Sequence, residues 1–258
     1  MTAGLNNKRS IAAAVAALGI LAASAAHGTL ILSATIGGVP VCAVDNNLFA
    51  CSHGTVLLDN NATIGLLGLG GAGGAVTVGG VDVFGSLQTS TKAPSTNILT
   101  NSSLQIINNN ALAVDASVAV SDTNFTPPVF TASTSGSGTW VNAAGSDITL
   151  EWYNDPTNAQ GAENPFDRPG ILIDTFTDVA GPGNPDAFAH IAAQGNVLDP
   201  NPFSMTLAFD ITLAGGARLE GRSMAEIKPQ GAVPEPATLA LLGLGLSALG
   251  LSRRRKRA

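Results

Sequence analysis

Apolar and polar side chains alternate along several stretches of this chain. In the segment from Ser204 to Leu213, every second residue is apolar: Met205, Leu207, Phe209, Ile211 and Leu213. An alternation of period two is typical of a β-strand with one buried face. Shorter alternations around Val114–Val120 and Ile148–Tyr153 indicate further strands. No window has the sustained period of about 3.6 residues that marks an amphipathic helix, so we expect an all-β fold.

Turn residues separate these predicted strands. Ala214-Gly215-Gly216 follows the clearest one, and Arg218 to Ile227 is expected to return as its hairpin partner. Elsewhere, Gly, Asn, Asp and Pro punctuate strands of about 5 to 10 residues, a rhythm that indicates a sandwich. We therefore predict a single β-sandwich-like domain over residues 27–232.

An apolar stretch near the N-terminus has the pattern of an export signal. Lys8 and Arg9 precede the apolar segment Ile11–Leu21, and Ser24-Ala25-Ala26 supplies the small residues that signal peptidase requires. We predict a signal helix within residues 1–26 and cleavage between Ala26 and His27. The alternative is an uncleaved anchor, but the apolar segment is shorter than the roughly 20 residues that span a bilayer.

A second apolar stretch lies near the C-terminus. Pro234, Glu235 and Pro236 precede the apolar segment Leu239–Leu251, and a basic cluster follows it: Arg253, Arg254, Arg255, Lys256 and Arg257. By the positive-inside rule this cluster stops transfer across the membrane. The 14 residues from Thr238 to Leu251 make a helix of about 21 Å, which is short for a permanent anchor. The alternative is an ordinary tail anchor after a proline-rich linker.

The order of these three parts resembles the PEP-CTERM sorting signal of exported proteins in Gram-negative bacteria. The resemblance implies that residues 233–258 form a sorting and anchor segment. It also implies that Pro234, Glu235 and Pro236 are recognised by an exosortase, a membrane-embedded cysteine protease. Such a protein is held transiently in the inner membrane and then passed to the cell surface or the extracellular matrix.

Charge is distributed unevenly along the chain. Its formal net charge is −6, but 17 of the 18 acidic residues and only five of the 12 basic ones lie between residues 27 and 233. So acidic a body repels phosphate backbones and anionic lipid surfaces. We therefore expect no nucleic-acid partner.

The two cysteines are close in sequence. Cys42 and Cys51 flank eight residues, and two nearby thiols usually pair in an oxidising compartment. We predict a Cys42–Cys51 disulfide, with two unpaired buried thiols as the alternative.

Residues for metal binding or catalysis are sparse. Asp45-Asn46-Asn47, Asp59-Asn60-Asn61 and the acidic segment 154–202 could supply calcium ligands, although Asp and Asn also simply form turns. His53 and His190 lack a recognisable nucleophile context. The carboxyl pair Glu151 and Asp174 is conceivable for glycoside hydrolysis. We predict no cofactor, no metal and no enzymatic activity.

Aromatic residues cluster at Trp140, Trp152 and Tyr153. Alternation places Trp152 and Tyr153 on opposite faces of a strand, so one of them faces solvent. An exposed aromatic platform would suit stacking on sugar rings, whereas core packing is the default for a Trp in a strand. The stretch Leu150–Pro156 is also similar to exported proteins of unassigned activity, some linked to flocculation and matrix. We expect a non-catalytic secreted or cell-surface protein acting in adhesion or structure of a biofilm matrix. The alternative is a carbohydrate-binding module that binds extracellular polysaccharide.

Overall fold

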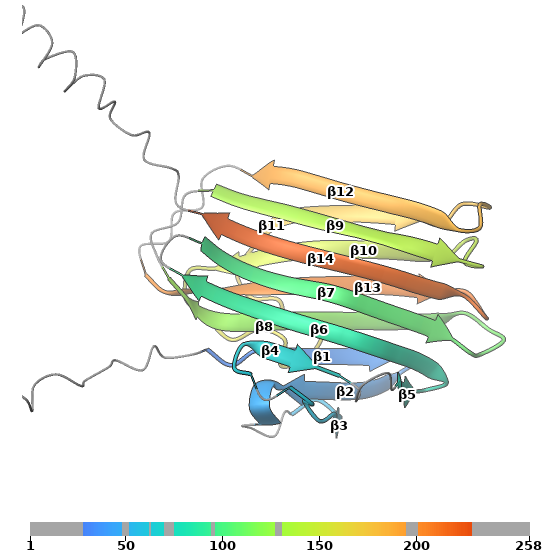
Figure 1. Cartoon of the computed structure of the whole chain (residues 1–258), viewed down its shortest axis with the longest axis horizontal. Helices are drawn as coiled ribbons and strands as arrows, with labels where there is room; N and C mark the ends of the chain where they lie inside the picture. The colour runs from blue at the N-terminus through green and yellow to red at the C-terminus, as the bar shows by residue number, and fades with distance from the viewer. Residues whose placement is uncertain are drawn as a thin grey trace, which may run out of the picture.

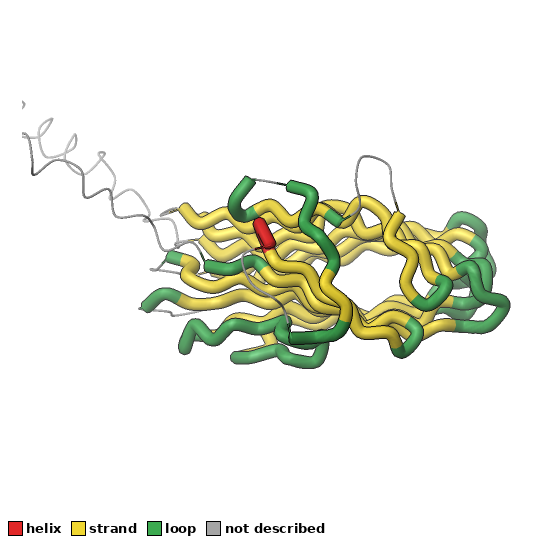
Figure 2. The backbone as a smooth tube through the Cα atoms, turned by 90° about the horizontal axis from the view of Figure 1, so that it is seen from below, coloured by secondary structure: helices red, strands yellow, loops and turns green. Residues whose placement is uncertain are grey.

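Two β-sheets lie face to face in the protein (Figures 1 and 2). The computed structural model describes residues 28–47, 52–61, 63–69, 75–93, 96–126, 131–194 and 201–228. Within these residues each sheet has seven strands, and all but one of the strand pairs are antiparallel. The described part of the chain is therefore an all-β sandwich, as the alternation predicts.

The strands are named here in their spatial order. Sheet 1 contains β11 (Ile171–Val179), β10 (Asp147–Asp155), β13 (Phe203–Leu213), β8 (Val114–Phe125), β1 (Ile31–Ile36), β2 (Val39–Val44) and β3 (Thr55–Val56). Sheet 2 contains β12 (Asp186–Gln194), β9 (Thr131–Val141), β14 (Arg218–Lys228), β7 (Thr96–Asn108), β6 (Val81–Ala93) and β4 (Leu66–Gly68), and β5 (Ala75–Val78) also pairs with β6. A 3-10 turn, η1 (Asp45–Asn47), follows β2.

The core forms where the apolar faces of the two sheets meet. On β13 the predicted alternation is confirmed, because Met205, Leu207 and Phe209 belong to the buried cluster between the sheets. The first half of the opposite face of β13 is also buried, at Ser204, Thr206 and Ala208. The segment between β10 and β11 covers it, and there the backbone N–H of Gly161 donates to Ser121 Oγ at 3.2 Å.

The predicted hairpin between β13 and β14 is wrong. β13 pairs with β10 and β8 in sheet 1, whereas β14 pairs with β9 and β7 in sheet 2. The chain crosses from one sheet to the other at Ala214–Ala217, and Asn108 Nδ2 donates to the carbonyl oxygens of Leu213 and Ala214 there. Crossing the sandwich lets the apolar faces of both strands bury each other, whereas a hairpin would place them side by side in one layer.

The two sides of the sandwich end differently. On one side the sheets end in β11 and β12, each nine residues long. On the other side the outermost strands are β3, with two residues, and β4, with three. Several apolar side chains on the long edge strands are exposed: Ile171, Leu172, Val179 and Ile191.

The predicted terminal helices lie outside the described residues. The described strands extend from Ile31 to Lys228, so the proposed division at residues 27 and 233 stays a prediction. Within the described part of the chain, no helix has both the length and the apolar character needed to cross a membrane.

Candidate ligand-binding groove

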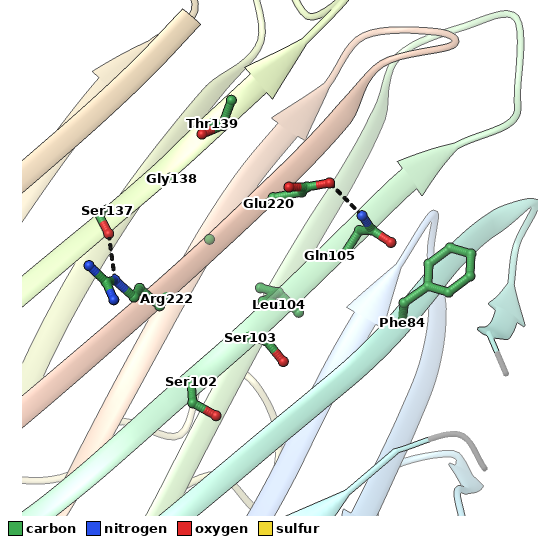
Figure 3. A pocket seen from close by; sticks show the side chains of 11 residues that line it. Phe84, Ser102, Ser103, Leu104, Gln105, Ser137, Gly138, Thr139, Glu220 and Arg222 are labelled. Carbon is green, nitrogen blue, oxygen red and sulfur yellow. Dashed lines mark hydrogen bonds between the residues drawn. The ribbon is translucent and has the colours of Figure 1, made fainter. Parts of the chain in front are cut away.

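A row of polar side chains crosses the outer face of sheet 2. The row follows from strand register, because Phe84 on β6 is opposite Gln105 on β7, Gln105 is opposite Glu220 on β14, and Glu220 is opposite Thr139 on β9. Directly paired residues point to the same face of a sheet, and neighbouring strands lie about 4.8 Å apart. The four side chains therefore form a continuous line across four strands (Figure 3).

A groove of about 540 Å³ runs along this row. Hydroxyl, amide and charged side chains dominate its lining, with one aromatic ring: Phe84, Ser102, Ser103, Leu104, Gln105, Ser137, Gly138, Thr139, Glu220, Gly221 and Arg222. A second hollow of about 450 Å³ adjoins it and shares Ser102, Ser137 and Arg222 with it. Each volume lies within the range of about 300 to 1,000 Å³ that is usual for small-molecule sites.

Irregular strand pairing shapes the centre of the groove. The register between β14 and β7 shifts at Gly221/Ser223, so Arg222 lies opposite the two residues Ser102 and Ser103. Both serines are exposed, which a β-bulge permits and a regular strand does not. Gly138 and Gly221 are register partners beside this point and add no side chain. The bulge thus places two exposed hydroxyl groups on β7, the strand beside Arg222.

Hydrogen bonds hold the charged groups of the groove in place. Gln105 Nε2 donates to Glu220 Oε1 at 2.6 Å, and Arg218 Nε lies 3.3 Å from the same oxygen. Arg222 Nε donates to Ser137 Oγ at 2.9 Å (Figure 3). The groove therefore presents fixed donors and acceptors, which is the arrangement that orients a polar ligand.

The conceivable carboxyl pair Glu151 and Asp174 is not brought together. Glu151 points out of sheet 1, where it pairs with Arg168 and accepts a hydrogen bond from Tyr153 OH. Asp174 lies opposite Trp152 and points into the sandwich. The two carboxylates thus occupy opposite faces of the sheet and cannot act on one bond, so this part of the sequence interpretation is wrong.

Glu151 and Asp174 each interact with other side chains of the fold instead. Asp174 Oδ2 lies 2.8 Å from His190 Nε2 and accepts a hydrogen bond from Thr134 Oγ1, while Phe176 stacks on His190.

Burial alone would lower the pKa of the Arg168 guanidinium, but its ion pairs with Asp210 and Glu151 outweigh this and raise the pKa. Burial, followed by the hydrogen bond to Glu151, raises the pKa of the Tyr153 hydroxyl.

Both tryptophans pack in the core, which is the default for a Trp in a strand. Trp140 and Trp152 are 1% and 0% exposed, and Trp140 Nε1 donates to Asp178 Oδ2 at 2.7 Å. The prediction that Trp152 and Tyr153 take opposite faces is confirmed, but the Tyr153 hydroxyl is engaged by Glu151. Sequence reasoning missed the groove. The sequence feature that could have indicated the groove is the alternation of hydroxyl side chains along β9, at Ser133, Ser135, Ser137 and Thr139.

The carboxylates of the two Asp/Asn triplets accept hydrogen bonds from backbone N–H groups of neighbouring loops. Asp59 Oδ2 accepts the backbone N–H of Asn46 at 2.8 Å, and Asp45 Oδ2 accepts that of Gly65 at 2.7 Å. Burial raises the pKa of the Asp45 carboxyl, and repulsion from Asp59 adds to this. Among the residues that the structure describes, no three His, Cys, Asp or Glu side chains gather as a metal site would require. The turn interpretation of these triplets therefore fits their contacts.

Most predicted processing residues lie outside the described residues. These are Ala26, His27 and Cys51, the motif Pro234, Glu235 and Pro236, and the basic residues 253–257. Cys42 is described, is buried on β2 and is not a free thiol. Its pairing with Cys51 stays a prediction.

Comparison with known proteins identifies one segment. Residues 232–256 match the family model of the PEP-CTERM protein-sorting motif. No curated protein matches the chain.

Solved structures resemble the fold only distantly. TmCBM61 in complex with β-1,4-galactotriose is 7% identical, with 52% of this chain and 83% of that chain covered and a TM-score of 0.33. The CBM22-1 xylan-binding domain from Paenibacillus barcinonensis Xyn10C is 17% identical, with 63% and 90% covered and a TM-score of 0.27. The structure of infectious bursal disease virus, Gx strain, is 11% identical, with 81% and 57% covered and a TM-score of 0.30.

Proposed function

Because the chain carries the PEP-CTERM protein-sorting motif of an exported exosortase substrate, we propose that it is a non-catalytic protein of the extracellular matrix. In this proposal, signal peptidase removes residues 1–26, and the C-terminal segment holds the protein transiently in the inner membrane. The exosortase then releases the body to the cell surface, where its groove binds matrix polysaccharide.

The groove on sheet 2 is the observation that carries this proposal. A sugar presents many hydroxyl groups and apolar ring faces, so its site needs several placed donors and acceptors beside some apolar surface. Gln105, Glu220, Thr139 and Arg222 supply the polar groups, and Phe84 supplies a ring at one end of the row. Since the groove is open along its length, a polymer can cross it without presenting a chain end.

The binding proposal is tested with the exported protein on an array of neutral and acidic glycans. We expect saturable binding that is lost when Gln105→Ala and Thr139→Ala are combined, because two polar contacts of the row disappear. The matched control combines Thr149→Ala with Thr177→Ala, a hydrogen-bonded threonine pair on the outer face of sheet 1. Binding to no glycan, or equal loss in the control, would overturn the proposal.

A structural role in matrix assembly is the second candidate. The observation that favours it is the pair of nine-residue edge strands, β11 and β12, because a long edge with exposed apolar side chains is a template for pairing with another chain. Ile191 on β12 is 85% exposed. We expect Ile191→Lys to convert associated copies to monomers in light scattering, while the exposed loop variant Leu112→Lys does not. A wild-type protein that is already monomeric would contradict this role.

Sorting is tested separately in cells that carry an exosortase. We expect the combined Pro234→Ala and Glu235→Ala variant to stay uncleaved in the membrane fraction, because the protease recognition element is removed. Pro229→Ala, in the same linker but outside the motif, serves as the control and is expected to be released. Normal release of the motif variant would refute this assignment. Mass spectrometry of both ends of the released protein locates the two cleavage sites.

A further inference from the structure

The basic residues of the described chain differ in their partners. Four of the five lie within 4 Å of a carboxylate: Lys92 with Asp122, Arg168 with Glu151 and Asp210, Arg218 with Glu220, and Lys228 with Glu226. Arg222 is the fifth, and it has no ion pair with any acidic side chain that the structure describes. In so acidic a body, a cation without a carboxylate partner is unusual.

The position of Arg222 makes this charge accessible to a ligand. Arg222 is exposed and lines both adjoining hollows on the outer face of sheet 2. Its Nε donates to Ser137 Oγ, which orients the guanidinium, and this hydrogen bond does not use the two terminal nitrogen groups (Figure 3). Two such parallel N–H donors match the two oxygens of a carboxylate.

The acidic side chains nearest to Arg222 along β14 are already engaged. Glu220 interacts with Gln105 and Arg218, and Glu226 interacts with Lys228 and Ser133. Neither reaches Arg222, although both point to the same face of the strand as it does. The negative charge of Glu220 and Glu226 still repels a polyanion at long range. At physiological salt, where the Debye length is about 8 Å, this long-range repulsion is screened more strongly than a direct contact between Arg222 and a carboxylate.

We infer that the groove recognises an acidic polysaccharide, with Arg222 binding the carboxylate of a hexuronic acid residue. Ser137 lies beside the guanidinium, and the exposed Ser102 and Ser103 lie on β7, on the other side of β14 (Figure 3). In this inference these hydroxyls contact the hydroxyl groups of the same sugar and of its neighbour. Gln105, Glu220 and Thr139 extend this polar surface along the groove for the neighbouring sugar units. This inference rests on the proposed glycan-binding function and specifies its ligand class.

The test measures binding of the exported full protein to polygalacturonate and to its methyl ester, which caps the carboxylate on the same sugar chain. Calorimetry at about 0.15 M salt, with EDTA present to exclude calcium bridging, gives the affinities. We expect the free acid to bind at least about tenfold more tightly than the ester, since a hydrogen-bonded charge pair is lost. Dextran sulfate and neutral dextran form the second ligand pair.

Variants then assign the effect to one side chain. Arg222→Gln is expected to weaken polygalacturonate binding by about tenfold to a hundredfold, and Arg222→Lys by less, because lysine keeps the charge but loses the paired donors. Lys228→Gln is the matched control, because it removes the same charge from the same strand and face but outside the groove. It is expected to bind like the wild type.

The possible outcomes distinguish failure of the acidic-ligand inference from failure of the proposed glycan-binding function. If the protein binds no glycan of any kind, the proposed function fails as well. If it binds neutral glycans and Arg222→Gln changes nothing, the glycan-binding function stands and the acidic ligand is refuted. Preference for the sulfated polymer over polygalacturonate would also refute the assignment of a carboxylate.

Discussion

Asn108 joins the two sheets at the end of the sandwich where the chain crosses between β13 and β14. Its side chain is 0% exposed, and Nδ2 donates to the carbonyl oxygens of Leu112, Leu213 and Ala214 at 2.9, 2.9 and 3.1 Å. Its Oδ1 accepts the backbone N–H of Asn110 at 2.9 Å. The substitution Asn108→Asp keeps the shape of the side chain but replaces the donating amide with an oxygen. We expect a large and pH-dependent loss of stability.

The size of this loss follows from the buried acceptors. An ionised carboxylate would face three carbonyl oxygens without a donor, so the group is forced toward its neutral form. Protonating an aspartate of ordinary pKa about 3.9 costs about 4 kcal/mol at pH 7, at about 1.4 kcal/mol per pH unit. The neutral hydroxyl can donate to only one carbonyl, so the lost hydrogen bonds add about 1 kcal/mol. The total decrease in the free energy of unfolding is about 5 kcal/mol at neutral pH.

The pH dependence has a definite sign. The folded-state pKa of the introduced carboxyl is raised above the unfolded value, so its contribution is most favourable below pH 4 and is lost as the pH rises. Protonation costs only about 1 kcal/mol at pH 4.5, so the deficit relative to wild type shrinks by about 3 kcal/mol between pH 7 and pH 4.5. Urea unfolding of both proteins at the two pH values measures this difference.

A control variant separates burial from charge. Asn201 is exposed two residues before β13, so Asn201→Asp adds the same charge without the buried acceptors and is expected to change the free energy of unfolding by less than about 0.5 kcal/mol. The reasoning is refuted if Asn108→Asp and Asn201→Asp are equally stable at pH 7. It is also refuted if the deficit of Asn108→Asp does not shrink in acid.

Three further predictions concern the interior and the covering segment. Trp140→Ala is expected to lower the unfolding free energy by about 3 to 5 kcal/mol, because a buried indole is removed; a calorimetric scan that matches the wild type would contradict this. Burial opposes ionisation of Asp155, but hydrogen bonds from Thr157 and Ala159 outweigh it and lower the pKa of this carboxyl. Asp155→Asn should therefore lower the free energy of unfolding by about 1 to 3 kcal/mol above pH 4. The difference from the wild type should shrink as the pH falls through the low folded-state pKa of Asp155. A difference that stays constant in an acid titration of stability would contradict this role of the Asp155 carboxylate. Gly138→Ala places a Cβ 2.5 Å from Phe188 Cζ and 2.8 Å from the backbone oxygen of Glu220, so it should lower the free energy of unfolding by about 1 to 3 kcal/mol through overpacking. Thermal unfolding measures this change, and an unchanged midpoint would contradict it.

Alternation along the chain was sufficient to find strands but not their partners. The segment Ser204–Leu213 lies within β13, and its apolar face is buried as its sequence predicts. The glycines after it are equally compatible with a hairpin and with a crossing between sheets. Because period two specifies which face is buried but not which edge is paired, the choice depends on the neighbours that arrive from elsewhere in the chain.

The same limit applied to the candidate sites. Alternation correctly separated Trp152 from Tyr153, because neighbouring residues of a strand take opposite faces. It could not place Glu151 and Asp174, which lie on different strands whose pairing brings the two carboxylates to opposite faces of sheet 1. It also could not predict that the segment between β10 and β11 covers part of the outer face of sheet 1, while the outer face of sheet 2 carries the groove.

The sequence by itself therefore determined the sorting motif and the β class, whereas only the tertiary structure determined which side chains meet on the surface. The sorting motif at residues 232–256 is readable because it is a pattern of residues in their order along the chain. The β class is readable because burial of one strand face is a local property. The groove instead combines Phe84 and Gln105 on the consecutive strands β6 and β7 with Thr139 on β9 and Glu220 on β14, which is remote in sequence. Only strand register places these side chains in one row, because register is set by the joint burial of both sheets.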